Sequence, residues 1–146
     1  MLFDSSIGAK APDFTLKDVT GKEMALSSFQ GKPILLNFWA TWCPYCRRER
    51  PHLNELYNLY KDKGLIILSV ATDQSTSKVT DFLKKTPADF IVLTDSTGTA
   101  MSLYNVAGLP TSYLIDGKGI IKQRFMGFRE WTDPGSKKLI DKLFDN

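Results

Sequence analysis

The amino-acid sequence predicts an α/β fold: a central mixed β-sheet covered by helices on both faces. Short apolar runs alternate with helical patterns through the middle of the chain, which is typical of parallel βαβ units. The last two apolar runs are joined by "GKG" at 117–119, which indicates an antiparallel hairpin. No repeat or linker divides the 146 residues, so we expect a single domain over 1–146.

The first elements form an N-terminal extension ahead of the main sheet, over residues 1–32. The segments "DFTLKD" at 13–18 and "KEMAL" at 22–26 flank a turn at Gly21 and predict a short hairpin. The segment "SSFQGK" at 27–32 then suggests one helical turn. The core of the domain is expected to span 33–146.

The core begins with a buried strand at 33–39 and a helix at about 44–61. Pro44 suits the first turn of that helix, but Pro51 lies inside it and is expected to kink it. The remaining elements follow from the same alternation. They are strands at 65–71, 90–95, 111–116 and 120–125, and helices near 76–85, 98–104 and 132–144.

Composition narrows the class of protein without naming a function. A hydrophobic fraction of 42% with 24% charged residues is ordinary for a soluble globular protein and excludes disorder. A net charge of +3 gives little support to nucleic-acid binding, and none is expected. The longest apolar stretches, at 33–40 and 64–71, fall far below the roughly 20 residues that cross a bilayer. The first residues lack the features of a secretory signal, which leaves a cytosolic protein or a removed signal or anchor.

Both cysteines of the chain lie in "WATWCPYC" at 39–46, between a strand and a helix. Cys43 falls just before the helix N-terminus, where N–H groups and the helix dipole favour a thiolate. Cys46 stacks on the same helical face and can close a small disulfide ring with Cys43. We expect an exposed Cys43 and a shielded Cys46, an arrangement suited to thiol–disulfide exchange, with Pro44 and Tyr45 tuning the potential.

Two other uses of the cysteines remain as alternatives. A structural zinc site needs about four ligands, whereas this chain contains two cysteines and one histidine, His52, so no metal is expected. A purely structural disulfide between residues this close would stabilise the fold only slightly.

The chain resembles the thioredoxin superfamily, specifically the TlpA/ResA/CcmG-like thiol–disulfide oxidoreductases. The resemblance rests on "GAKAPDFTL", "LSSFQGKPILLNFWATWCPYCRRERPHL" and "GLPTSYLID", followed by Gly127. It implies a single domain of the thioredoxin fold. It also implies that Cys43 is the nucleophile, Cys46 the resolving thiol, and Pro110 a cis-proline packed beside the active-site disulfide.

The resemblance also indicates how a substrate would be held. A cis bond at Pro110 would turn the backbone of Leu109 toward the sulfurs, where it could pair with an extended substrate segment. Trp42 is expected to cover the sulfurs and, with Pro44 and Tyr45, to form a docking surface. Trp39 is expected to pack in the hydrophobic core.

Glu49 is the candidate proton acceptor for Cys46. Asn37 occupies the position that matches a buried aspartate in ordinary thioredoxins, and asparagine cannot accept a proton. Glu49 lies three residues after Cys46 on the same helical face and matches a glutamate of the ResA-like subgroup. We expect it to take the Cys46 proton with a pKa raised by partial burial. The alternative is a solvated glutamate beside Arg48 and Arg50.

Three arginines, Arg47, Arg48 and Arg50, follow the second cysteine and allow two interpretations. They could stabilise the Cys43 thiolate or attract acidic partners. A solvated, charged helix face explains them equally well.

The leading hypothesis is an enzyme that reduces protein disulfides as a monomer, without metal or organic cofactor. The resemblance implies a site outside the cytoplasm, in the periplasm or on the outer face of the membrane, with apocytochrome c as substrate and a membrane thiol as electron donor. A thioredoxin-fold peroxidase is one competitor, but Leu36 and Ala40 occupy the positions of its proline and threonine. The other is a binding module that keeps its disulfide for structure alone.

Overall fold

The computed structural model describes residues 6–145, which form one seven-stranded sheet with four α-helices. The strands are β1 (Thr15–Asp18), β2 (Glu23–Ala25), β3 (Ile34–Trp39), β4 (Ile66–Ala71), β5 (Ile91–Thr94), β6 (Thr111–Ile115) and β7 (Ile121–Met126). The helices are α1 (Pro44–Tyr60), α2 (Thr76–Lys85), α3 (Thr99–Leu103) and α4 (Pro134–Leu143), with 3₁₀ turns η1 (Leu26–Phe29) and η2 (Lys61–Lys63). None of these helices is long and apolar enough to cross a membrane. The elements expected from the sequence are confirmed, with small differences at their ends.

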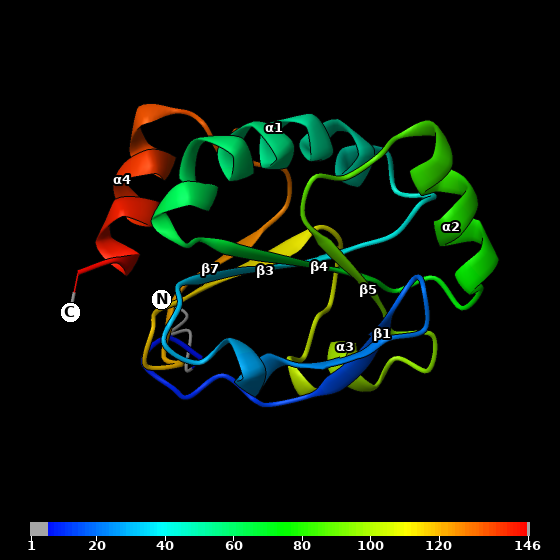
Figure 1. Ribbon diagram of the computed structural model, residues 1–146, viewed down its shortest axis with the longest axis horizontal. Helices are drawn as coiled ribbons and strands as arrows, with labels where there is room; N and C mark the ends of the chain where they lie inside the picture. The colour runs from blue at the N-terminus through cyan, green and yellow to red at the C-terminus, as the bar shows by residue number, and fades with distance from the viewer. Residues whose placement is uncertain (1–5, 146) are drawn as a thin grey trace.

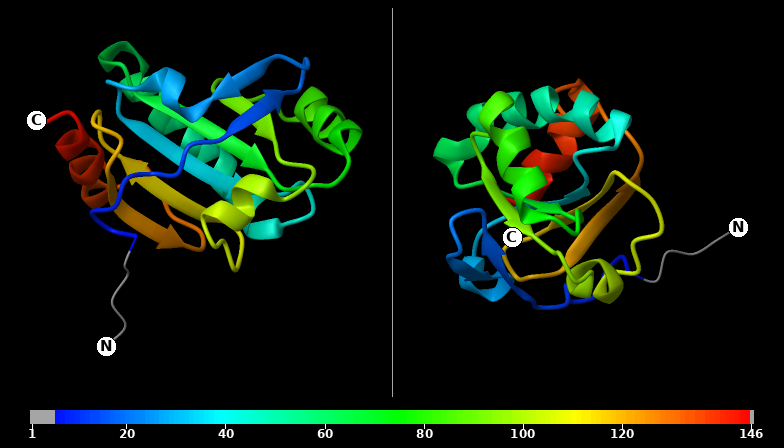
Figure 2. Two further views of the ribbon diagram at one scale, coloured as in Figure 1. Left: turned by 90° about the horizontal axis from the view of Figure 1, so that it is seen from below. Right: turned by 90° about the vertical axis from the view of Figure 1, so that its right-hand side faces the viewer.

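The sheet is mixed, in the order β2-β1-β5-β4-β3-β6-β7. Strands β3, β4 and β5 run parallel, and β6 and β7 join the β3 edge as antiparallel strands. The N-terminal hairpin is not detached from this sheet, because β1 pairs with β5 and extends that edge (Figure 2, left). The parallel strands bring their carboxyl ends to one edge, where loops that carry chemistry can meet.

Helices cover both faces of the sheet, as expected. Helices α1, α2 and α4 lie over one face, and α3 with the N-terminal segment lies over the other (Figure 1). All six residues of β3 are buried because both faces of the strand are covered. Its side chains alternate, so Leu35 and Trp39 pack toward α1 while Leu36 and Phe38 pack toward α3. Ala40 and Cys43, which follow Trp39, pack in the same cluster on the α1 side.

Helix α1 runs unbroken from Pro44 through Pro51 to its end. Proline at the first helical position removes no hydrogen bond, because the first N–H groups of a helix have no intrahelical partner. The buried face of the helix includes Cys46, Glu49 and Arg50 at its start, and Leu53 and Leu56 farther on. This spacing carries three reactive or charged side chains into the protein interior beside β3.

Candidate active site

The sulfur of Cys43 caps the N-terminus of helix α1. The Cys46 backbone N–H donates to Cys43 Sγ at 3.3 Å, and Cys43 is the N-cap residue. The two thiols are not bonded to each other, so the structure holds the reduced pair. This contact gives a partner to one of the first N–H groups of the helix, which have none within the helix. The sequence-predicted position of Cys43 at the helix start is confirmed.

Both thiols are buried, which corrects the expectation of an exposed Cys43. Cys43 is 5% exposed and Cys46 is 1% exposed. Burial raises the pKa of the Cys46 thiol above its ordinary value, and the hydrogen bond and charge of Cys43 and the charge of Glu49 act in the same direction. Cys43 is thus the more accessible sulfur, while Cys46 is held in its neutral form.

A carboxylate from the neighbouring strand fixes the loop that leads into the cysteines. Asp73 follows β4 and accepts hydrogen bonds from the Thr41 N–H at 3.0 Å and the Thr41 hydroxyl at 2.6 Å. The Thr72 N–H donates to the Trp39 carbonyl at 2.8 Å. Asp73 was not predicted from the sequence, although its place two residues after a strand parallel to β3 puts it at the same sheet edge.

Glu49 is buried and hydrogen-bonded through both carboxyl oxygens. Its exposed fraction is 1%, so the alternative of a solvated glutamate is wrong. Oε1 accepts from Asn37 Nδ2 at 3.1 Å, and Oε2 accepts from the Arg129 N–H at 3.0 Å and from Trp131 Nε1 at 3.1 Å. Asn37 also donates to the Ser112 hydroxyl at 2.9 Å, which holds the amide in place.

The pKa of Glu49 is matched to proton transfer near neutral pH. Burial raises it to about 7, although the hydrogen bonds from Trp131, the Arg129 N–H and Asn37, and the charge of Arg50, act to lower it. At neutral pH the carboxyl therefore exists in both protonation states. Glu49 lies three residues from Cys46, on the buried face of the same helix.

The raised pKa of Glu49 predicts a loss of stability as the pH rises. Between its ordinary value of 4.5 and about 7, the unfolded chain releases the Glu49 proton while the folded protein keeps it. The folded state then binds more protons, so the free energy of unfolding falls by about 3 kcal/mol across this window. Urea unfolding at pH 4.5 and 7.5 should show this fall in the wild type and lack it in Glu49→Gln. The exposed Glu55→Gln control should behave as the wild type; equal falls in all three would contradict the assignment.

Arg50 differs from the other two arginines. Arg47 and Arg48 are exposed, whereas Arg50 is 2% exposed, which excludes a solvated helix face for Arg50. Its Nη1 donates to the Ser69 hydroxyl at 3.1 Å, and its guanidinium lies 3.7 Å from the centre of the Trp39 ring. A charged group thus lies in the core beneath the cysteines.

Aromatic side chains beside the cysteines are open to solvent. Trp42 is 68% exposed and Tyr45 is 57% exposed, and Pro44 between them is also exposed. The Arg48 guanidinium lies 5.5 Å from the Tyr45 ring centre and 5.3 Å from that of Phe128. Exposed aromatic groups next to a charged group are typical of protein docking surfaces.

The Leu109–Pro110 peptide bond is cis, which confirms that expectation for Pro110. Pro110 is buried at the start of β6, and Leu109 is partly buried and packs against the apolar clusters on both faces of the sheet. The Thr111 hydroxyl donates to the Gly108 carbonyl at 2.6 Å and closes the turn. Pairing of the Leu109 backbone with a substrate stays a prediction.

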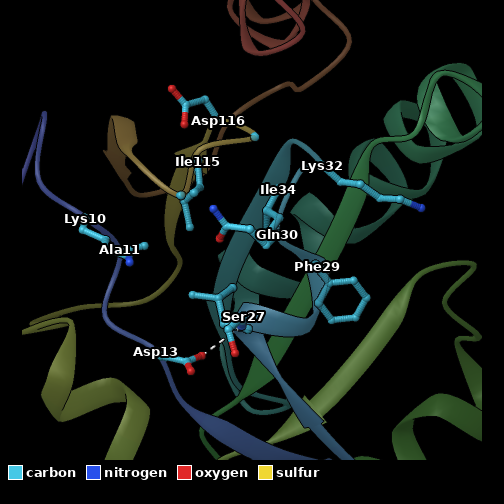
Figure 3. Close-up of a pocket in the computed structure, with 13 residues that line it drawn as sticks. Lys10, Ala11, Asp13, Ser27, Phe29, Gln30, Lys32, Ile34, Ile115 and Asp116 are labelled. Atoms are coloured by element: carbon cyan, nitrogen blue, oxygen red, sulfur yellow. Dashed lines mark hydrogen bonds between the residues drawn. The ribbon is translucent and has the colours of Figure 1, made fainter. Parts of the chain in front are cut away.

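A partly enclosed hollow lies away from the cysteines. It measures about 130 Å³ and is built by the N-terminal segment, η1 and the β6–β7 connection (Figure 3). Ile34 in its lining starts β3, whereas the cysteines follow the other end of that strand. No cysteine lines it, and residues 6–145 contain no group of three histidine, cysteine or acidic side chains that could hold a metal.

Comparison with known proteins gives a consistent result. The model of the AhpC/TSA family matches residues 7–124. The thiol-disulfide oxidoreductase ResA from Bacillus thuringiensis is 42% identical over 137 residues, covering 94% of this chain and 78% of the relative. A putative thiol:disulfide interchange protein DsbE from Chlorobium tepidum superposes with a TM-score of 0.83 at 39% identity, covering 94% of each chain. StoA from Bacillus subtilis superposes with a TM-score of 0.73 at 26% identity, over 90% of this chain and 96% of its own.

Proposed function

The chain belongs to the AhpC/TSA family and is a thiol–disulfide oxidoreductase of the thioredoxin fold, and from this premise we propose that it reduces protein disulfides through Cys43 and Cys46. One observation carries the proposal. The Cys43 sulfur accepts the Cys46 N–H at the start of α1, while Cys46 is the less exposed of the two residues. This geometry provides one nucleophile and one shielded resolving thiol.

The reaction proceeds by two sulfur exchanges. The Cys43 thiolate attacks one sulfur of the substrate disulfide, whose S–S bond breaks, and the departing thiolate takes a proton from solvent. Cys46 then loses its proton and attacks Cys43 Sγ, which breaks the mixed disulfide and releases the second substrate thiolate. Two electrons pass to the substrate, and the protein is left with a Cys43–Cys46 disulfide.

Glu49 accepts the proton that Cys46 loses in the second step. This role is supported by the pKa of about 7, which leaves a substantial fraction of carboxylate at neutral pH. The hydrogen bonds from Asn37 and Trp131 hold the carboxyl group in one orientation. The negative charge of Glu49 also acts to raise the pKa of Cys46, after the larger effects of burial and of Cys43.

The substrate docks on the exposed side of the cysteine pair. Trp42, Pro44 and Tyr45 provide an apolar surface, and the Leu109 backbone beside Pro110 pairs with an extended segment of the substrate. The small exposed fraction of Cys43 supports docking of a flexible or unfolded segment, because only a thin chain can present its sulfur to so covered a thiol.

The physiological substrate that we propose is the haem-binding cysteine pair of apocytochrome c. The TlpA/ResA/CcmG-like resemblance supports this substrate, a location outside the cytoplasm, and re-reduction by a membrane thiol donor. The protein acts as a monomer and needs no cofactor, because the two electrons reside in its own thiols.

A peptide with an oxidised Cys-x-x-Cys-His segment tests both substrate and direction. Reduced wild type should convert it to the dithiol peptide, and Cys43→Ser should leave it oxidised, because the mixed disulfide cannot form. Oxidation of the reduced peptide by the oxidised protein, without the reverse reaction, would overturn the proposed direction. Peroxide consumption that requires Cys43 but not Cys46 would make the protein a peroxidase instead.

A further inference from the structure

Arg50 is a buried cation without a carboxylate partner in contact. Its side chain is 2% exposed, and no carboxylate in the described part of the chain lies within 4.0 Å of the guanidinium. Nη1 donates to Ser69, but Nη2 is buried without a hydrogen-bond partner among residues 6–145. Buried donors are rarely left unsatisfied, so this group needs an explanation beyond packing.

Aromatic rings replace part of the water that Arg50 has lost. The guanidinium lies 3.7 Å from the ring centre of Trp39, 5.3 Å from that of Phe90 and 5.8 Å from that of Phe82. Cation–π contacts stabilise the positive charge but do not neutralise it. Burial lowers the pKa of Arg50 to about 10, so the side chain remains charged at neutral pH.

The negative charges near Arg50 come from the cysteine site. Arg50 follows Cys46 by one helical turn and is adjacent to Glu49, and all three lie on the buried face of α1. A helical side chain leans toward the helix N-terminus, which for Arg50 is the direction of Cys46. A negative charge on the Cys46 sulfur, when this thiol ionises, or on the Glu49 carboxyl stabilises the guanidinium.

We propose that Arg50 is a positioning residue whose fixed positive charge balances the negative charge that passes between the Glu49 carboxylate and the Cys46 sulfur during resolution. This inference rests on the proposed role of Glu49. Before proton transfer the buried site holds an ionised Glu49, a neutral Cys46 and Arg50; afterwards it holds a neutral Glu49, a Cys46 thiolate and Arg50. Each state contains one anion and one cation, so neither state buries an unbalanced charge.

Other charged groups around Glu49 do not supply this balance. Cys46 and Arg50 are the titratable groups of its own helix that interact with Glu49 electrostatically. Arg129 approaches from the segment after β7, but it reaches Glu49 through its backbone N–H. Its guanidinium is engaged elsewhere, with Nε donating to the Ser136 hydroxyl at 2.7 Å and the group lying 4.1 Å from the Phe125 ring centre.

Removal of the Arg50 charge should lower the fraction of Glu49 that is ionised, and so able to accept a proton, at neutral pH. In Arg50→Met and Arg50→Gln, the Glu49 midpoint, read by ¹³C NMR of the carboxyl carbon, should rise by about one pH unit, a tenfold change in proton affinity. The low-pH limb of the single-turnover rate should move upward by the same amount. Arg50→Lys keeps the charge and should stay close to the wild type.

Two controls separate charge from structure. Ser69→Ala removes the hydrogen bond to Arg50 but not its charge, and Arg47→Met makes the same substitution at an exposed arginine of the same helix. Both should leave the Glu49 midpoint in place. An unmoved midpoint in folded Arg50→Met and Arg50→Gln would overturn the proposal.

Stability gives a second test if the neutral variants do not fold alone. Glu49→Gln/Arg50→Met carries neither charge and should fold, because it buries no unbalanced ion. Failure of this double variant to fold would also overturn the proposal. The NMR midpoint does not depend on turnover, so failure of the Arg50 proposal is distinct from failure of the base role, which would appear as an unchanged rate in Glu49→Gln.

Discussion

Replacement of Cys46 with alanine is expected to convert the protein into a covalent trap. Cys43 keeps its position at the helix N-terminus and still attacks substrate disulfides, but no thiol remains to release the product. Steady-state reduction should fall by about 10³-fold or more, because a covalent step has lost its nucleophile. At the same time, a mixed disulfide between Cys43 and the substrate should accumulate.

Mass spectrometry of the trapped species measures this outcome. The adduct should have the mass of protein plus substrate, map to Cys43 and disappear when dithiothreitol is added. Cys43→Ala is the matched control and should trap almost nothing, because Cys46 is 1% exposed and its burial disfavours the thiolate. Equal trapping through Cys46 would contradict the division into a nucleophile and a resolving thiol.

Glu49→Gln is expected to slow resolution by about 100-fold at neutral pH, in the range of general-base effects. Because a base acts only when ionised, the wild-type rate should rise with pH through about 7, the pKa of Glu49. The glutamine variant should lack this rise, since an amide does not titrate in this pH range and does not act as a base. Above pH 8 the two rates should approach each other as hydroxide takes over the proton.

Decay of a preformed mixed disulfide on Cys43 isolates this step from substrate binding. Stopped-flow release of a chromogenic thiol between pH 5 and 9 gives the resolution rate directly. Glu55→Gln changes an exposed glutamate of the same helix and should reproduce the wild-type profile. If Glu49→Gln keeps the wild-type pH profile, Glu49 is not the base in this step.

The fold and the position of the two cysteines at the start of a helix could be predicted because their signals are local. The alternation of apolar runs and helical patterns specifies the layers, and the spacing of Cys43 and Cys46 at the start of a helix specifies their relation. The cis bond before Pro110 was predicted from the family resemblance. Residue patterns alone would not predict it, because prolines occur in loops for many reasons.

The contacts of Glu49 could not be predicted from the residues near it in the sequence. Two of its three hydrogen-bond donors, the Arg129 N–H and Trp131 Nε1, lie about 80 residues away in the sequence, on a segment without a recognisable motif. The burial of Arg50 was missed for a related reason. A run of arginines after a helix start resembles a solvated face, and only the packing of α1 over β3 shows that the third one points at Trp39.

Transfer of electrons in a single turnover tests the central claim most directly. Reduced wild type is mixed with an equimolar amount of a model disulfide protein, quenched in acid and analysed by peptide mass spectrometry. One substrate disulfide should be reduced for each Cys43–Cys46 disulfide formed, and both Cys43→Ala and Cys46→Ala should fail to complete the exchange. A substrate that stays oxidised beside an intact, folded dithiol, or that is reduced without formation of the Cys43–Cys46 disulfide, would contradict the account.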